Sequence, residues 1–163
     1  MLQNSLPTII RWSILLGLFT IFGCQPEQRP EGLPILVPFQ LTLTQDSQPL
    51  VGANVQLVSE EIHFPVTGLT NANGVARLVT YGQFSGVPLG TYKVVVIKTE
   101  TEGETSNETQ TQPIFIYSLV DPALTNRATT TLEVLVEKGK KSTTLDVGKS
   151  VRVLIDTIEP SKM

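Results

Sequence analysis

Two residue types that often carry catalysis or metal binding, cysteine and histidine, occur once each in this 163-residue chain, as Cys24 and His63. A Ser-His-Asp or Cys-His arrangement would have to use His63 as its base. His63 follows Glu60 and Glu61, a grouping that could suggest a metal site. A lone histidine in a loop is, however, more often simply exposed to solvent. The sequence therefore predicts no metal site at His63.

The motifs that mark common enzyme chemistries do not occur in the sequence. It holds no H-E-x-x-H, P-loop or G-x-G-x-x-G pattern, and the segment GQFSG at 82–86 has its serine one position late for a nucleophile elbow. Asn71, Asn73 and Asp121 could supply oxygen ligands to calcium, but turn chemistry accounts for the two asparagines without an ion. Only a carboxylate pair such as Glu60 with Asp121 could serve acid–base chemistry. We therefore expect no enzymatic activity, no metal and no cofactor.

The start of the chain reads as an export signal. Residues 1–11 carry the free amine and Arg11, and residues 12–23 (WSILLGLFTIFG) are uncharged and mostly apolar. A basic start, an apolar run and a small residue before the cut describe a secretory signal peptide. The run is shorter than the roughly 20 residues with which a helix crosses a bilayer. Two alternatives stay open: Cys24 ends an uncleaved membrane anchor, or it follows an ordinary signal peptide as a free thiol.

The residues up to Cys24 resemble the lipobox of bacterial lipoproteins, in which a Leu-like residue and two small or apolar residues precede a cysteine. Here the sequence is IFGC at 21–24. The resemblance implies cleavage before Cys24, a diacylglycerol on its thiol and acylation of its new amino group. One acyl chain holds a protein on a bilayer only marginally, whereas two or three make a durable anchor. Because Gln25 is not the aspartate that resembles an inner-membrane retention signal, the outer membrane is favoured, at its periplasmic or surface face.

The charge balance argues against a nucleic-acid partner. The chain has 12 Lys and Arg against 15 Asp and Glu, a net charge of −3, whereas nucleic-acid binding needs a concentrated basic surface. Five basic residues do gather near the C-terminus, and we interpret them as a solvated strand end and turn. They are Lys138, Lys140, Lys141, Lys149 and Arg152.

Behind the predicted cut the chain divides into a tether, one domain and a tail. Residues 24–34 hold the cysteine and a proline-rich, polar stretch typical of an extended tether. Residues 35–158 show a period of two in apolar side chains, which predicts β-strands, and 159–163 form the tail. We expect strands at 39–44, 53–58, 66–70, 75–80, 91–98, 113–120, 130–137 and 143–155, with a break in the last at Gly148. Seven or eight short strands with Gly, Pro and Asn turns predict an all-β fold, a single antiparallel sandwich.

Particular residues refine this prediction. Segment 91–98 has apolar residues on both faces, which is typical of a central, doubly covered strand. Gly52 and Gly74 suit turn positions with positive φ. Tyr92 should bury its ring and find a hydrogen-bond partner for its hydroxyl.

Three segments resemble carboxypeptidase-regulatory-like (transthyretin-like) domains. They are QPLVGANV at 48–55, GLTNANGV at 68–75 and PLGTYKV at 88–94. Small lipoproteins of this kind also carry a later Tyr and Asp-Pro segment and a glycine turn, which Tyr117, Asp121 and Gly139 match. The resemblance spans residues 36–147 and implies a prealbumin-like or Ig-like sandwich with structural motifs. Hydrolases of the transthyretin-like group need several histidines and a C-terminal motif that this chain does not have.

Two kinds of function remain open. The first is a non-catalytic structural or protein-interaction module, which contacts an envelope protein through a strand edge or a loop. Residues 99–112 are predicted to be a long, polar hairpin tip or insertion that contributes acidic side chains to that contact, namely Glu100, Glu102, Glu104 and Glu108. The alternative is binding of a carbohydrate or small ligand at the cell surface, for which Tyr81 and Phe84 are the best pair of aromatic residues.

The lipidation hypothesis makes a direct prediction. Replacing Cys24 by serine removes the thiol that would accept diacylglycerol, so the Cys24→Ser protein should leave the membrane fraction of the native cells. Fractionation by ultracentrifugation, followed by immunoblotting, measures the change. A Cys24→Ser protein that stays fully with the membranes would show that lipid on this residue is not the anchor.

Overall fold

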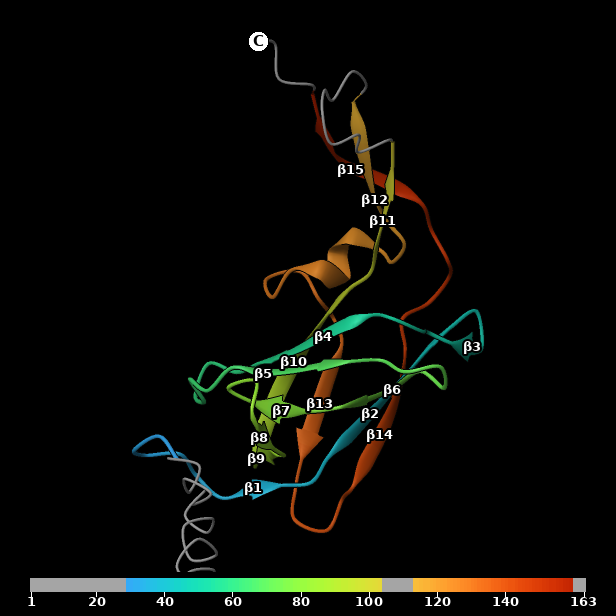
Figure 1. The fold of residues 1–163 in the computed structure, drawn as a ribbon. Helices are drawn as coiled ribbons and strands as arrows, with labels where there is room; N and C mark the ends of the chain where they lie inside the picture. Colours follow the sequence, from blue (N-terminus) through green and yellow to red (C-terminus); the bar gives the residue numbers. More distant parts are fainter. Residues whose placement is uncertain (1–28, 104–112, 160–163) are drawn as a thin grey trace, which may run out of the picture. The chain divides into compact units, whose positions relative to one another are not determined.

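The computed structural model describes residues 29–103 and 113–159, and this part of the chain is all-β (Figure 1). The predicted signal peptide, Cys24 and the residues after Glu159 lie outside the described residues. A compact unit begins at Leu33. The described residues contain short strands and one 3-10 helix, η2 (Pro122–Thr125). The strands are β1 (Leu36–Val37), β2 (Gln40–Gln45), β3 (Gln48–Pro49), β4 (Asn54–Val58), β5 (Val66–Leu69), β6 (Val75–Arg77), β7 (Val79–Thr80), β8 (Phe84–Ser85), β9 (Val87–Pro88), β10 (Gly90–Ile97), β11 (Thr99–Glu102), β12 (Ile114–Ser118), β13 (Glu133–Val136), β14 (Ser142–Asp146) and β15 (Val153–Ile158).

The strands form several sheets. A six-stranded sheet has the order β13-β10-β4-β5-β7-β8. A four-stranded sheet has the order β14-β2-β3, with β6 also paired to β2. A three-stranded sheet, β11-β12-β15, and the pair β1-β9 complete the described strands. Among these pairings only β14 with β2 is parallel, and the others are antiparallel.

Alternation of side chains explains why the two larger sheets share one core. Along β2, Leu41 and Leu43 are fully buried while their neighbours are not, and β4 buries every second residue in the same way. These side chains join those of β10 and β13 in a single cluster of buried hydrophobic residues. Within the described residues, none from β11, β12 or β15 belongs to this cluster. Each fully buried Val or Leu side chain contributes roughly 1.5–3 kcal/mol, so this cluster is the main source of stability.

One predicted strand proves to connect the two sheets. Segment 75–80, expected as a single strand, forms β6, which pairs with β2, and β7, which pairs with β5. Leu78, between them, is buried. The chain crosses from one sheet to the other at Leu78, because a straight strand cannot pair with both. This division and other short pairings explain why the structure has more strands than the seven or eight expected.

The predicted turn before β6 is held against β2. The side-chain oxygen of Asn71 accepts hydrogen bonds from the backbone N–H groups of Asn73 and Val75, at 2.9 and 3.1 Å. Gly74 has φ +72°, and a Cβ there would lie 2.5 Å from the carbonyl oxygen of Leu43. Only glycine fits this close approach, so the prediction of a positive φ at Gly74 is confirmed.

Strand β10 is central, as predicted, because it pairs with β13 on one side and β4 on the other. Val94 and Val96 belong to the core cluster. Val95, between them, is also buried but does not belong to that cluster. The ring of Tyr92 is buried, and its hydroxyl donates a hydrogen bond of 2.8 Å to the carbonyl oxygen of Pro88. Burial raises the pKa of Tyr92 to about 12.

The Tyr92 hydrogen bond can be tested by alkaline unfolding. Unfolded tyrosine ionises near its ordinary pKa of 10.0, whereas the folded side chain keeps its proton until about pH 12. The free energy of unfolding should therefore fall between these two pH values, because the unfolded chain loses the proton first. Tyr92→Phe should remove this part of the pH dependence. It should also cost about 1–3 kcal/mol at neutral pH by leaving the Pro88 carbonyl unpaired.

Urea unfolding at several pH values measures both effects. The control is Tyr81→Phe, since the side chain of Tyr81 is exposed. A Tyr92→Phe protein that is as stable as the unsubstituted protein both at neutral pH and near pH 12 would contradict the assigned hydrogen bond.

Candidate interaction surface

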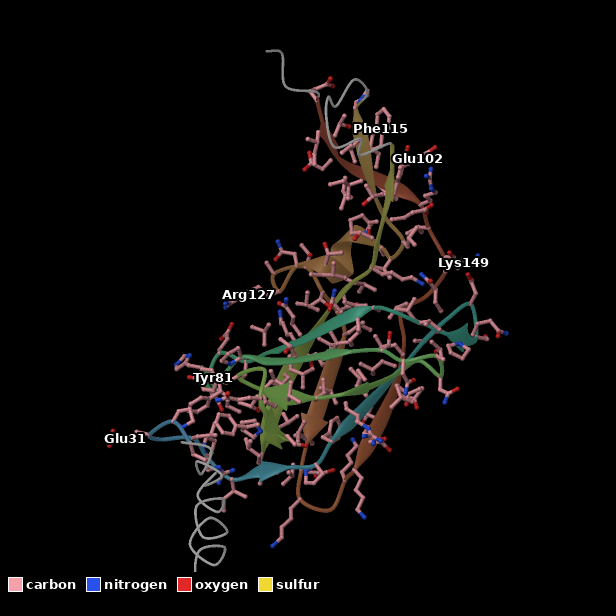
Figure 2. All side chains as sticks on the ribbon, in the orientation of Figure 1. Glu31, Tyr81, Glu102, Phe115, Arg127 and Lys149 are labelled. Carbon is pink, nitrogen blue, oxygen red and sulfur yellow. The ribbon has the colours of Figure 1, made fainter. Side chains whose placement is uncertain are left out.

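The three-stranded sheet is built from a hairpin and the last strand of the described chain. Strand β12 (IFIYS) is rich in β-branched and aromatic residues, which favour extended structure. It pairs with β11 so that Phe115 lies opposite Glu102 (Figure 2). On its other side β12 pairs with β15, with a register shift between Ile116 and Tyr117. The hairpin and β15 thus make a sheet in which β11 and β15 are the two edges (Figure 1).

Arg152 fastens the start of β15 to the hairpin. Its Nε lies 3.4 Å from a carboxylate oxygen of Glu100, and its Nη2 donates to Glu102. Its guanidinium carbon lies 3.5 Å from the centre of the Tyr117 ring, within cation–π range. Hydrogen bonding to Arg152, together with its charge, lowers the pKa of Glu102. All three strands therefore meet at one arginine.

Hydrogen bonds tie this sheet to the end of β2. The side-chain amide of Gln45 donates to the carbonyl oxygen of Leu119 at 2.9 Å. The carboxylate of Asp46 accepts from the backbone N–H of Ser150 at 2.8 Å. These bonds place the segments that flank β12 and β15 beside the end of β2. They position a sheet that contributes nothing to the core cluster.

Strand β15 exposes an unusual amount of apolar surface for its length. Val153, Leu154, Ile155 and Ile158 are 40, 50, 50 and 46 % exposed. Asp156 is the only charged residue in the strand. Within the described residues, β15 pairs only with β12, so its other edge offers unpaired backbone groups. A free edge with exposed apolar side chains is the feature to which another extended segment adds as a strand.

Two of the four acidic residues expected in an interaction loop lie on a strand instead. Residues 99–102 were expected within the polar hairpin tip or insertion, and this part of the prediction is wrong, because they form β11 and pair with β12. Glu100 and Glu102 are engaged by Arg152 from within the chain. Glu104 and Glu108 lie outside the described residues. The structure therefore brings two of the four residues together, on a strand stabilised by β-branched threonines and by Arg152.

The two aromatic residues considered for ligand binding differ in exposure. Phe84 is buried in β8, whereas Tyr81 is 44 % exposed. The ring of Tyr81 packs edge-on against Phe64, with ring centres 5.7 Å apart. A cavity of about 430 Å³ is lined by Phe64, His63 and Arg127 among others. The exposed ring of Tyr81 thus pairs with the half-buried Phe64, a residue that the sequence did not point to.

The remaining polar candidates have local structural roles. Asp121 accepts a hydrogen bond of 2.9 Å from the backbone N–H of Ala123 and caps η2. Asn71 organises the turn before β6. In residues 29–103 and 113–159, no three His, Cys, Asp or Glu side chains gather where they could hold a metal ion. No helix in the same residues is both long and apolar enough to cross a membrane.

The arginine contact can be tested without knowing a partner. Arg152→Gln removes the charge shared by Glu100, Glu102 and the Tyr117 ring, so the backbone amides of β15 should exchange with solvent several-fold faster. Those of β10 should not change. Because the pKa of Glu102 is lowered in the folded state, the same loosening should appear in the unsubstituted protein as the pH falls through that pKa.

Hydrogen exchange followed by mass spectrometry measures both effects, with Arg127→Gln as the control for loss of an exposed arginine. Equal protection of β15 in Arg152→Gln and in the unsubstituted protein would show that Arg152 does not hold the strand.

Comparison with known proteins does not assign the chain to a family. No protein-family model, curated protein or solved structure matches it. Its function is therefore inferred from its own sequence and geometry.

Proposed function

We propose that this chain is a lipid-anchored lipoprotein of the cell envelope whose β-domain is a non-catalytic protein-interaction module. The partner is an envelope protein that adds an extended segment to the free edge of β15. The observation that carries the proposal is the exposure of Val153, Leu154, Ile155 and Ile158 on that edge strand. These side chains are not buried in the core cluster, so burying them against a partner would contribute favourable hydrophobic free energy to binding.

Under this proposal the six-stranded and four-stranded sheets form a transthyretin-like sandwich of the carboxypeptidase-regulatory-like type. Support comes from the single hydrophobic cluster to which both sheets contribute. The resembling segments at 48–55 and 68–75 also supply Gly52 and Gly74, both with positive φ. In that group of domains these motifs serve the fold, which agrees with a module that binds rather than catalyses.

The anchor is proposed from the sequence around Cys24. Acyl chains on this cysteine hold the protein on a membrane, and residues 25–34 act as the tether. The outer membrane is favoured because Gln25 follows the cysteine. Anchoring on a surface raises the effective concentration of the domain near envelope partners, so a modest affinity at β15 is sufficient.

Binding of a carbohydrate or small ligand remains the alternative. It is supported by the exposed ring of Tyr81 against Phe64, and by the cavity of about 430 Å³ that Phe64 and His63 line. Stacking of a sugar on Tyr81 would be insensitive to substitutions in β15. The two functions therefore separate in one experiment.

The test is chemical crosslinking in the native cells, followed by capture through a C-terminal tag and identification of the recovered proteins. A Leu154→Lys/Ile155→Lys variant places two charges on the β15 edge, where lysine opposes strand addition. Recovery of the specific partner should fall by about tenfold or more, as expected when central interface contacts are lost. Deletion of residues 104–112 spares β11 and β12 and should leave recovery unchanged.

The matched control is Leu69→Lys/Leu135→Lys, which alters two comparably exposed leucines, 60 and 47 % exposed, on the six-stranded sheet. This control should recover the partner as well as the unsubstituted protein does. Full recovery by the β15 variant would contradict the proposal. Loss of recovery on replacing Tyr81 instead, with glycan in the captured material, would favour the alternative.

A further inference from the structure

The topology gathers several basic residues at the end of the domain where β2 begins. Strands β2 and β14 are parallel, with Gln40 opposite Ser142, so both start at this end. Residues 137–141 connect β13 to β14 and therefore form a turn at the same end. The chain enters β2 at this end from β1, which precedes it in the sequence.

This end of the domain is strongly cationic. The turn carries Lys138, Lys140 and Lys141, with Glu137 as its one carboxylate. Arg77 of β6 lies opposite Gln40 of β2, on the side away from β14. Among the described residues, no ion pair involves any of these four basic side chains. The local excess of positive charge contrasts with the net charge of −3 of the whole chain.

Two of these four basic residues line a cavity. It has a volume of about 370 Å³ and is lined by Arg77, Lys141, Gln40, Ser85 and Ser142 together with a few apolar residues. None of the described residues that line it is acidic. Two cationic groups, two hydroxyls and an amide are donors that suit phosphate oxygens. We call the residues that line this cavity, together with the turn at 137–141, the basic end.

We propose that the basic end binds the phosphate groups of anionic phospholipids in the membrane that carries the anchor. The inference rests on the proposed lipid anchoring, because Leu36 follows Cys24 by only 12 positions. An extended chain of that length reaches roughly 40 Å, which keeps the domain next to the bilayer. Charge complementarity then selects the end that faces the lipid.

The orientation of the domain follows from this contact. Strand β10 begins at Gly90, opposite Val136 at the end of β13, and therefore starts near the basic end. It finishes at Ile97, two residues before β11 begins. With the basic end on the membrane, the edge of β15 is held away from it and stays accessible to a partner.

The test measures co-sedimentation of the full-length Cys24→Ser chain with vesicles, so that no acyl chain contributes to binding. Vesicles of equal parts phosphatidylglycerol and phosphatidylcholine should bind the protein, and binding should weaken as salt is added. Vesicles of phosphatidylcholine alone should bind far less. Arg77→Gln/Lys141→Gln should weaken binding roughly fivefold for each charge removed, thus about 25-fold.

The matched control is Lys93→Gln/Lys149→Gln, which removes the same charge from exposed positions outside the basic end. It should bind within about twofold of the parent chain, since charges distant from the surface contribute little. Equal binding to both vesicle types, or equal weakening by the two double variants, would overturn the proposal.

Titration with inorganic phosphate distinguishes the source of the ligand. Saturable phosphate binding that is lost in Arg77→Gln/Lys141→Gln, without any binding to vesicles, would assign the cavity to a free phosphate and overturn the membrane assignment. Because no acyl chain is present in this assay, its result is independent of lipidation. Failure of the anchor itself appears only in the fractionation of native cells.

Discussion

Burial of one hydrophobic cluster is the constraint on which the rest of this structure depends. The single cysteine excludes an internal disulfide, so apolar burial must hold the domain together. Leu41 and Leu43 of β2 and Tyr92, Val94 and Val96 of β10 occupy the same cluster, which joins two sheets. Alternation fixes the register of β2, since a slip of one residue would turn Leu41 and Leu43 away from the cluster. Turns and edges are arranged around this requirement.

The surfaces that we propose for function lie outside this cluster. Strands β11, β12 and β15 contribute nothing to it within the described residues, and an exposed arginine and two backbone contacts hold them in place. Exposed ion pairs of this kind stabilise weakly. A sheet held in this way keeps its apolar side chains available, and a partner strand on β15 would bury them. The basic end, at the start of β2, instead presents positively charged side chains.

The sequence predicts the parts of the fold that depend on local pattern. Alternation locates β2, β4, β5 and β10, and the Asn and Gly residues at 71–74 define a turn whose geometry the structure confirms. It also predicts the break at Gly148 between β14 and β15, but not the change of sheet at Leu78, because pairing partners are set by distant residues. For the same reason Val153 and Ile155 were assigned to a strand of the domain rather than to an exposed edge. The contact of Arg152 with Glu100 joins positions too far apart in sequence for pattern to link.

Addition of a partner strand to β15 can be tested with a photo-crosslinking amino acid at Ile155 in the native cells. We expect one discrete adduct with a single envelope protein on irradiation, and none when the same amino acid replaces Leu69, which is also exposed. Absence of an adduct at Ile155, or the same adducts from both positions, would contradict it.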